Sequence, residues 1–275
     1  MILTDSNKYF LLLILFQIFV VRGIAQKGWE VGGWLGASHY FGDLNTNLRI
    51  DKPGLAGGLL GRYNFDGRLC SRFGLSYGRI SADDANSENN FERNRNLSFQ
   101  SHILDLTTAI EFNFLQYEHG SRENYYTPYV FGGISIFYFN PTAQIGDQRV
   151  ALRGLGTEGQ AIGEEYGSIN GGIAIGGGFK WDISRELSMN IEISTRFLFT
   201  DYLDDVSTTY PDPDLLASRR GAIAVALSDR SLVPGISGLG RQRGNSKDND
   251  NYSFIGISVM RYFGSIACPK ISKID

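Results

Sequence analysis

Apolar and polar residues alternate along eight separate segments of this chain, and this period of two restricts its fold more than any other feature. In the first segment, Trp29, Val31 and Leu35 fall on one face of an extended strand, while Glu30 and Ser38 fall on the other. The eight segments are 29–41, 55–64, 69–80, 103–114, 129–139, 169–182, 189–200 and 252–263. The pattern predicts eight antiparallel strands.

Two architectures share this pattern: a soluble antiparallel barrel or sandwich with its apolar face inward, and a membrane barrel with its apolar face outward. The polar faces favour the second, because they carry most of the strand glycines in a chain with 34 Gly among 275 residues. A narrow barrel needs small residues inside, and charges buried there must pair. We expect ion pairs to close the lumen, formed by four acids and four bases: Glu30, Arg62, Arg72, Asp105, Glu111, Lys180, Glu192 and Arg196.

The connections between the segments indicate how such a barrel is oriented. Those on one side, 42–53, 81–101, 141–167 and 201–251, include all the long loops, whereas 66–67, 115–126 and 183–186 lie on the other side. Outer-membrane barrels have long extracellular loops and short periplasmic turns. We therefore predict an all-β fold: an eight-stranded antiparallel up-and-down transmembrane β-barrel over residues 26–263, with a short periplasmic tail over 264–275.

The only long apolar run of the chain lies at its amino terminus. Leu11–Val21 follows Lys8 and precedes Gly23-Ile24-Ala25, which is typical of a secretory signal peptide cleaved after Ala25. The alternative, a retained anchor, is disfavoured because the run is too short to cross a bilayer of about 30 Å as a helix. We thus predict that residues 1–25 are removed and that the barrel lies in the outer membrane of a Gram-negative cell.

The sequence gives little support for an enzymatic activity, a metal site or nucleic-acid binding. A formal net charge of -3 disfavours nucleic-acid binding. A lipid or acyl hydrolase could use His39 or His102 at the outer rim, but His102 and Asp105 fall on opposite strand faces and no Gly-x-Ser-x-Gly motif occurs. A small passive pore is a further alternative. We expect no catalytic residues, no cofactor and no metal site, since the Asp-rich loops lack the spacing of a calcium loop.

The two cysteines, Cys70 and Cys268, both fall near the predicted periplasmic rim. An oxidising compartment permits a disulfide between them, which would tie the tail to the barrel floor. The spacing cannot fix the geometry of such a bond, so a pair of thiols is the alternative.

Five segments in order resemble one known family. They begin with Trp29-Glu30-Val31-Gly32-Gly33-Trp34-Leu35-Gly36 and continue through Phe41-Gly42-Asp43-Leu44; the others are 77–85, 93–99, 111–114 and 127–133, the last reading TPYVFGG. Together they are similar to the PorG family, outer-membrane barrels of the type IX secretion system of Bacteroidetes. The resemblance covers 29–139; beyond that only the strand pattern continues.

The resemblance implies a non-enzymatic part of a protein-export machine, one that links the periplasmic ring of PorK and PorN to the outer membrane. Periplasmic partners could reach only the turns 115–126 and 183–186 and the tail 264–275. Within this set, Tyr117, Tyr125 and Tyr126 are the expected anchors, because aromatic residues at a rim can serve both the membrane interface and a protein contact. The alternative is that these tyrosines belong to the membrane interface alone.

Overall fold

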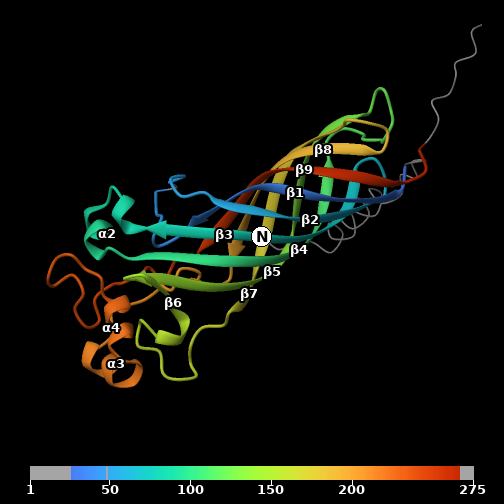
Figure 1. The fold of residues 1–275 in the computed structure, drawn as a ribbon. Helices are drawn as coiled ribbons and strands as arrows, with labels where there is room; N and C mark the ends of the chain where they lie inside the picture. The colour runs from blue at the N-terminus through green and yellow to red at the C-terminus, as the bar shows by residue number, and fades with distance from the viewer. Residues whose placement is uncertain (1–25, 48, 267–275) are drawn as a thin grey trace, which may run out of the picture.

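The computed structural model describes residues 26–47 and 49–266. Nine strands form one sheet, and eight of them close into a barrel (Figure 1). The strands are β1 (Gly28–Phe41), β2 (Gly54–Asn64), β3 (Leu69–Asp83), β4 (Ser98–Asn113), β5 (Tyr126–Ile145), β6 (Gln148–Ala151), β7 (Ile169–Asp182), β8 (Leu187–Leu198) and β9 (Asn251–Gly264). The predicted signal peptide, Cys268 and most of the predicted tail lie outside the described residues.

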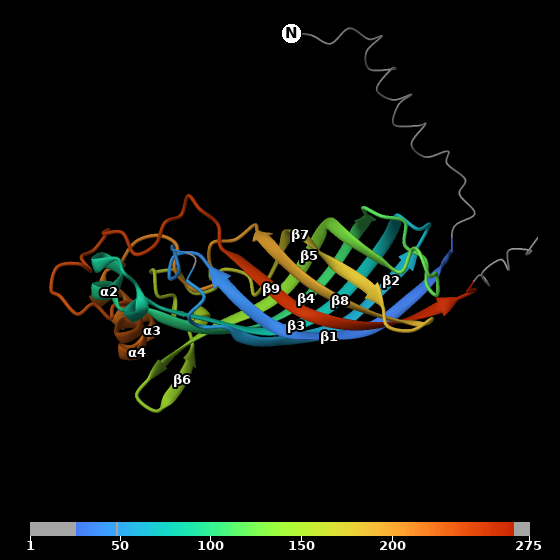
Figure 2. The same ribbon diagram turned by 90° about the horizontal axis from the view of Figure 1, so that it is seen from above.

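Every strand of the barrel pairs antiparallel with its neighbours along the chain, and the first and last strands complete the ring. β1 pairs with β9 from Gly28↔Gly264 to Phe41↔Asn251, while β4 pairs with β5. The short strand β6 lies outside the ring and pairs only with the last residues of β5, from Thr142 to Ile145. The prediction of an eight-stranded antiparallel up-and-down barrel is confirmed. Figure 2 shows the tilted strands side by side in the barrel wall.

The apolar face of each strand points outward. On β4, Leu104, Leu106 and Ile110 are 48%, 58% and 51% exposed, whereas Asp105 and Glu111 are fully buried in the lumen. A soluble barrel would show the reverse, because its apolar side chains would fill the interior. The outward apolar band is the arrangement of a membrane barrel.

Glycines on the lumen face make room for rings that point inward. A Cβ on Gly176 would lie 2.5 Å from the Phe131 ring, and one on Gly58 would lie 2.8 Å from Nε1 of Trp34. β5, whose two faces are both apolar, turns Phe131 and Phe137 inward and leaves Ile134 on the outer wall. The excess of glycine thus lets a narrow lumen be filled by large side chains.

Tight turns at one end of the barrel form around short polar side chains. Asp66 Oδ1 accepts hydrogen bonds from the backbone N–H groups of Arg68 and Leu69 between β2 and β3. Ser184 Oγ accepts from the N–H of Leu187 between β7 and β8. The third connection at this end, 114–125, is as long as the first connection at the other end, 42–53.

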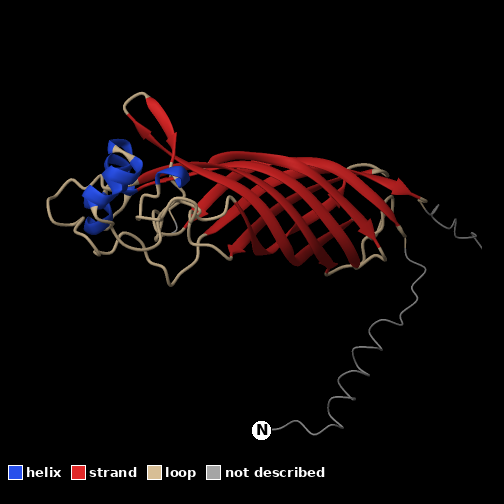
Figure 3. Ribbon diagram, turned by 90° about the horizontal axis from the view of Figure 1, so that it is seen from below, coloured by secondary structure: helices blue, strands red, loops and turns tan. Residues whose placement is uncertain are grey.

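The connections at the opposite end fold into a cap, where only loops were expected. Figure 3 shows its helices gathered beyond one end of the barrel. They are the 3₁₀ turns η1 (Asp84–Asn86) and η2 (Arg153–Leu155) and the α-helices α2 (Asn90–Arg95), α3 (Pro213–Arg220) and α4 (Ala222–Ser228). In the described residues, no helix is long and apolar enough to span a membrane.

The cap shares an apolar core with the adjoining end of the lumen. Leu44, Leu203 and Leu227 from the loops pack in one cluster with lumen residues such as Phe137 and Tyr252, all at most 2% exposed. The cap therefore seals this end of the barrel with apolar side chains.

Candidate functional site

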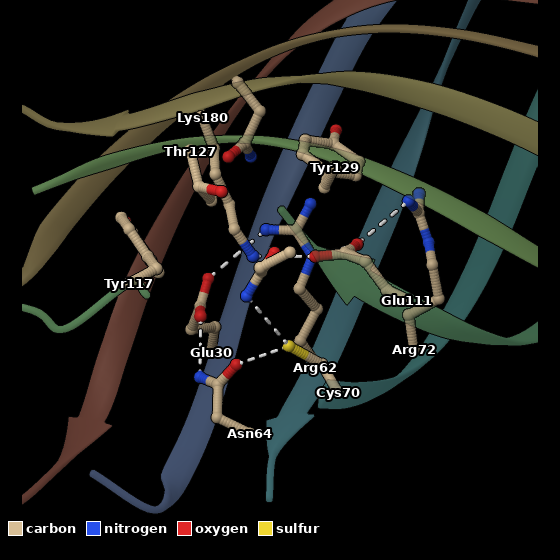
Figure 4. A network of polar contacts seen from close by, with 12 residues as sticks. Glu30, Arg62, Asn64, Cys70, Arg72, Glu111, Tyr117, Thr127, Tyr129 and Lys180 are labelled. Carbon is tan, nitrogen blue, oxygen red and sulfur yellow. Dashed lines mark hydrogen bonds and ion pairs between the residues drawn. The ribbon is translucent and has the colours of Figure 1, made fainter. Parts of the chain in front are cut away.

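The lumen near the turn end is filled by an ion-pair network whose centre is Glu111 on β4 (Figure 4). Its carboxylate accepts hydrogen bonds from Lys180 Nζ at 2.7 Å and Arg62 Nε at 2.9 Å, and lies 3.3 Å from Arg72 Nη1. Arg72 also pairs with Glu192 across the lumen at 2.7 Å. Three cations from three strands thus converge on one buried carboxylate, which compensates the cost of burying them.

Glu30 on β1 belongs to the same network. Its carboxylate lies 3.3 Å from Arg62 Nη1 and accepts a hydrogen bond of 2.7 Å from Asn64 Nδ2. The buried Cys70 thiol donates to Asn64 Oδ1 at 2.9 Å. Cys268 lies outside the described residues, so the disulfide stays a prediction.

A second layer lies nearer the cap, around Asp105 on β4. Arg196 Nε is 3.2 Å from Asp105 Oδ2, which also accepts from the hydroxyls of Ser135 and Tyr252. All eight of the charged residues expected in the lumen face it, and each has an oppositely charged partner there.

The connection 114–125 folds back under the lumen and closes it. His119 is 3% exposed, and its ring nitrogens lie 3.2 Å from Glu30 Oε1 and 3.0 Å from Asp182 Oδ1. Its ring stacks on Tyr262 with the centroids 4.4 Å apart. Burial alone would lower the pKa of His119, but the two carboxylates raise it to about 9. The two carboxylates thus favour the charged form of His119 and add it to the plug, which sequence reasoning missed because a turn carries no periodic signal.

Because of this fold-back, Tyr117 is buried and cannot contact a periplasmic partner as predicted. Tyr117 is 4% exposed, because its hydroxyl donates to Asp182 and its ring packs on His119. Tyr125 and Tyr126 are 44% and 38% exposed at the rim, with their rings 5.0 Å apart. They remain accessible, as does Ile183 in the next turn, which is 51% exposed.

Of the two rim histidines considered for a hydrolase, His39 is partly exposed on β1, and His102 lies on the opposite side of the barrel wall from Asp105. His102 faces outward and its Nδ1 lies 2.6 Å from the Tyr77 hydroxyl, whereas Asp105 is bonded inside the lumen. Within the described residues, no three His, Cys, Asp or Glu side chains are arranged to hold a metal ion.

The cap contains a buried carboxylate pair that no sequence spacing indicated. Tyr40 Oη lies 2.5 Å from Asp204 Oδ2 and 2.8 Å from Asp250 Oδ1, and all three side chains are at most 2% exposed. Burial, together with repulsion from neighbouring carboxylates such as Asp43, raises the pKa of both carboxyl groups well above the usual range. The residues are far apart in the chain, so only the fold brings them together.

A family described as "Domain of unknown function (DUF6089)" matches residues 8–223. No curated protein matches the chain. Among solved structures, Neisserial surface protein A is 8% identical with a TM-score of 0.44, covering 86% of this chain and 97% of that one. OprG from Pseudomonas aeruginosa is 11% identical with a TM-score of 0.44, covering 88% and 99%. Ail of Yersinia pestis, solved with the heparin analogue sucrose octasulfate, is 10% identical with a TM-score of 0.42, covering 86% and 99%.

Proposed function

Because the chain belongs to this DUF6089 family of unknown function, we propose its role from its own geometry: it is a non-conducting outer-membrane barrel that anchors periplasmic proteins through its turn end. The observation that carries this proposal is the filled lumen. Ion pairs around Glu111 and Asp105, the fold-back at His119 and the apolar cap occupy it in succession. A barrel filled in this way transports nothing through its centre, so its function must lie at its rims.

The turn end offers the surface for such an anchor. Tyr125 and Tyr126 present adjacent exposed rings, and the neighbouring turn adds Ile183 and the exposed Arg185. Aromatic side chains with an arginine nearby are the residues that most often dominate protein interfaces. The fold-back at His119 holds the connection in one conformation, which lowers the entropy lost when a partner binds.

We further propose that the machine is the type IX secretion system and that the partners are its ring proteins PorK and PorN. The support is the ordered resemblance of segments within 29–139 to the PorG family, together with a lumen that leaves only the rims for function. In this role the barrel is the membrane anchor of the ring, and it carries no catalytic group.

Co-purification from detergent-solubilised outer membranes tests the proposal. We expect PorK and PorN to accompany the intact barrel, and the double variant Tyr125→Ser/Tyr126→Ser to reduce their recovery about tenfold. The matched control is Arg149→Ser in β6, an exposed residue on the cap side, which should leave recovery unchanged. If the intact barrel brings down no ring protein, the assignment to this machine is wrong.

A further inference from the structure

A row of polar side chains crosses the outer wall of the barrel on three adjacent strands. Arg79 of β3 stands opposite His102 of β4, which stands opposite Asn140 of β5. Arg79 and His102 are exposed on the outer surface, and Asn140 is partly exposed. Side chains directly opposite on antiparallel strands are about 5 Å apart, so the three can contact one small ligand.

The row lies where the apolar wall ends on the cap side. Two residues nearer the middle of the barrel, the same strands carry Tyr77, Leu104 and Tyr138, which are 52%, 48% and 45% exposed. Tyrosines at this height are typical of a membrane interface. If the barrel occupies the outer membrane, as proposed above, the row faces the lipid headgroups of the outer leaflet.

The row presents hydrogen-bond donors that have no carboxylate partner. Within the described residues, Arg79 forms no ion pair, whereas Arg261, an exposed strand arginine at the other rim, pairs with Glu186 at 3.1 Å. The Tyr77 hydroxyl lies 2.6 Å from Nδ1 of His102 and its ring stacks on the imidazole. When Tyr77 donates this bond, the ring hydrogen of His102 is on Nε2, which is free to donate to a ligand.

We propose that Arg79, His102 and Asn140 bind a phosphate group of an outer-leaflet lipid. The guanidinium supplies a two-pronged, charge-assisted contact to phosphate oxygens, His102 Nε2 donates a further hydrogen bond, and the Asn140 amide completes the row. Lipid phosphate is the ligand because membrane lipid is what surrounds this part of the wall. The site rests on the proposed outer-membrane function and adds to it a preferred lipid contact on one side of the barrel.

The test compares lipids that differ only in phosphate. The full chain is reconstituted into phosphatidylcholine vesicles containing either phosphorylated lipid A or lipid A with its phosphates removed, and native mass spectrometry then measures the retained lipid. We expect the wild type to retain the phosphorylated form about tenfold more. The double variant Arg79→Gln/His102→Gln should lose this preference, and the matched control Arg261→Gln should keep it.

Equal retention of the two lipids by the wild type, or an unchanged preference in the double variant, would overturn the phosphate site while leaving the outer-membrane barrel intact. Insertion is measured separately, by resistance to protease and by the change in gel mobility on heating. A wild-type chain that fails to insert overturns both the proposed outer-membrane location and the lipid site.

Discussion

At the scale of single residues, the side chain on which most others depend is Glu111. Its carboxylate is fully buried and lies within 3.3 Å of nitrogen atoms of Arg62, Arg72 and Lys180. If Glu111 is neutralised, the three buried cations have only two carboxylate partners left, Glu30 and Glu192. A buried charge without a partner costs far more than an exposed one.

We expect Glu111→Gln to lower the free energy of unfolding by about 3 to 5 kcal/mol, because it breaks a buried ion-pair network. Urea unfolding in lipid vesicles measures this change. The control is Glu186→Gln, which removes an ion pair with Arg261 whose side chains are 53% and 60% exposed and should cost less than about 1 kcal/mol. Equal effects of the two substitutions would contradict the network.

At the scale of elements, the cap and the fold-back are held by groups that titrate. The long connection 199–250 places Asp204 and Asp250 on either side of Tyr40, whose hydroxyl has a single hydrogen for two carboxylates. A proton on one carboxyl group completes the chain of hydrogen bonds. Burial raises the pKa of Asp43 to about 6 and that of Asp201 to about 8 in the same cap. The cap is thus built around carboxyl groups that favour the protonated form.

We predict that the cap loosens as the pH rises. A carboxyl group whose pKa is raised by folding adds stability that is complete at low pH and is lost as the pH rises through the folded value. For Asp43 the loss begins above its usual pKa of 3.8 and is complete near pH 6, and for Asp201 it continues to about pH 8. The hydrogen-exchange protection factors of 199–250, which are corrected for the faster intrinsic exchange at higher pH, should fall between about pH 4 and pH 8, while those of the β7–β8 hairpin stay constant. Protection factors of 199–250 that stay constant or rise over this range would contradict the prediction.

The fold-back should respond to pH at a higher value. The carboxylates of Asp182 and Glu30 raise the pKa of His119 to about 9, so the stability it adds is complete below its usual pKa of about 6.5 and is lost as the pH rises through 9. We expect protease cleavage after Arg122 to accelerate as the pH rises from 6.5 to about 9, and His119→Gln to accelerate it already at pH 7. Cleavage that is equally fast in both proteins at pH 7 would show that His119 does not hold the connection.

At the scale of the whole molecule, the filled lumen predicts a barrel that does not conduct ions. We expect the purified protein in planar bilayers to give no steady single-channel conductance, because paired charges close the lumen near the turn end and apolar residues close it at the cap. A steady conductance in the wild type would favour a passive pore. Glu111→Gln, which disturbs the network, provides a comparison in the same recordings.

Strand periodicity predicted the wall of this molecule, since each strand obeys one local rule. Segment 169–182 matches β7, and the face carrying Glu111 and Asp105 points into the lumen. The cap and the fold-back followed no such rule. Tyr117 was expected among the interface aromatics, yet a long-range contact with Asp182 turns it inward, and a contact with Asp204 likewise holds Tyr40 inside the cap. Side chains placed by partners more than sixty residues away leave no trace in local spacing.

The ion pairs that cross the lumen constrain how the protein enters a membrane. Arg72 on β3 meets Glu192 on β8, and Lys180 on β7 meets Glu111 on β4, so these charges find partners only after the sheet has curled. A flat sheet inserted strand by strand would expose them to hydrocarbon, where each costs several kcal/mol. For the proposed outer-membrane barrel, we therefore expect the inner face to stay away from lipid until β9 reaches β1, so that closure and membrane entry coincide.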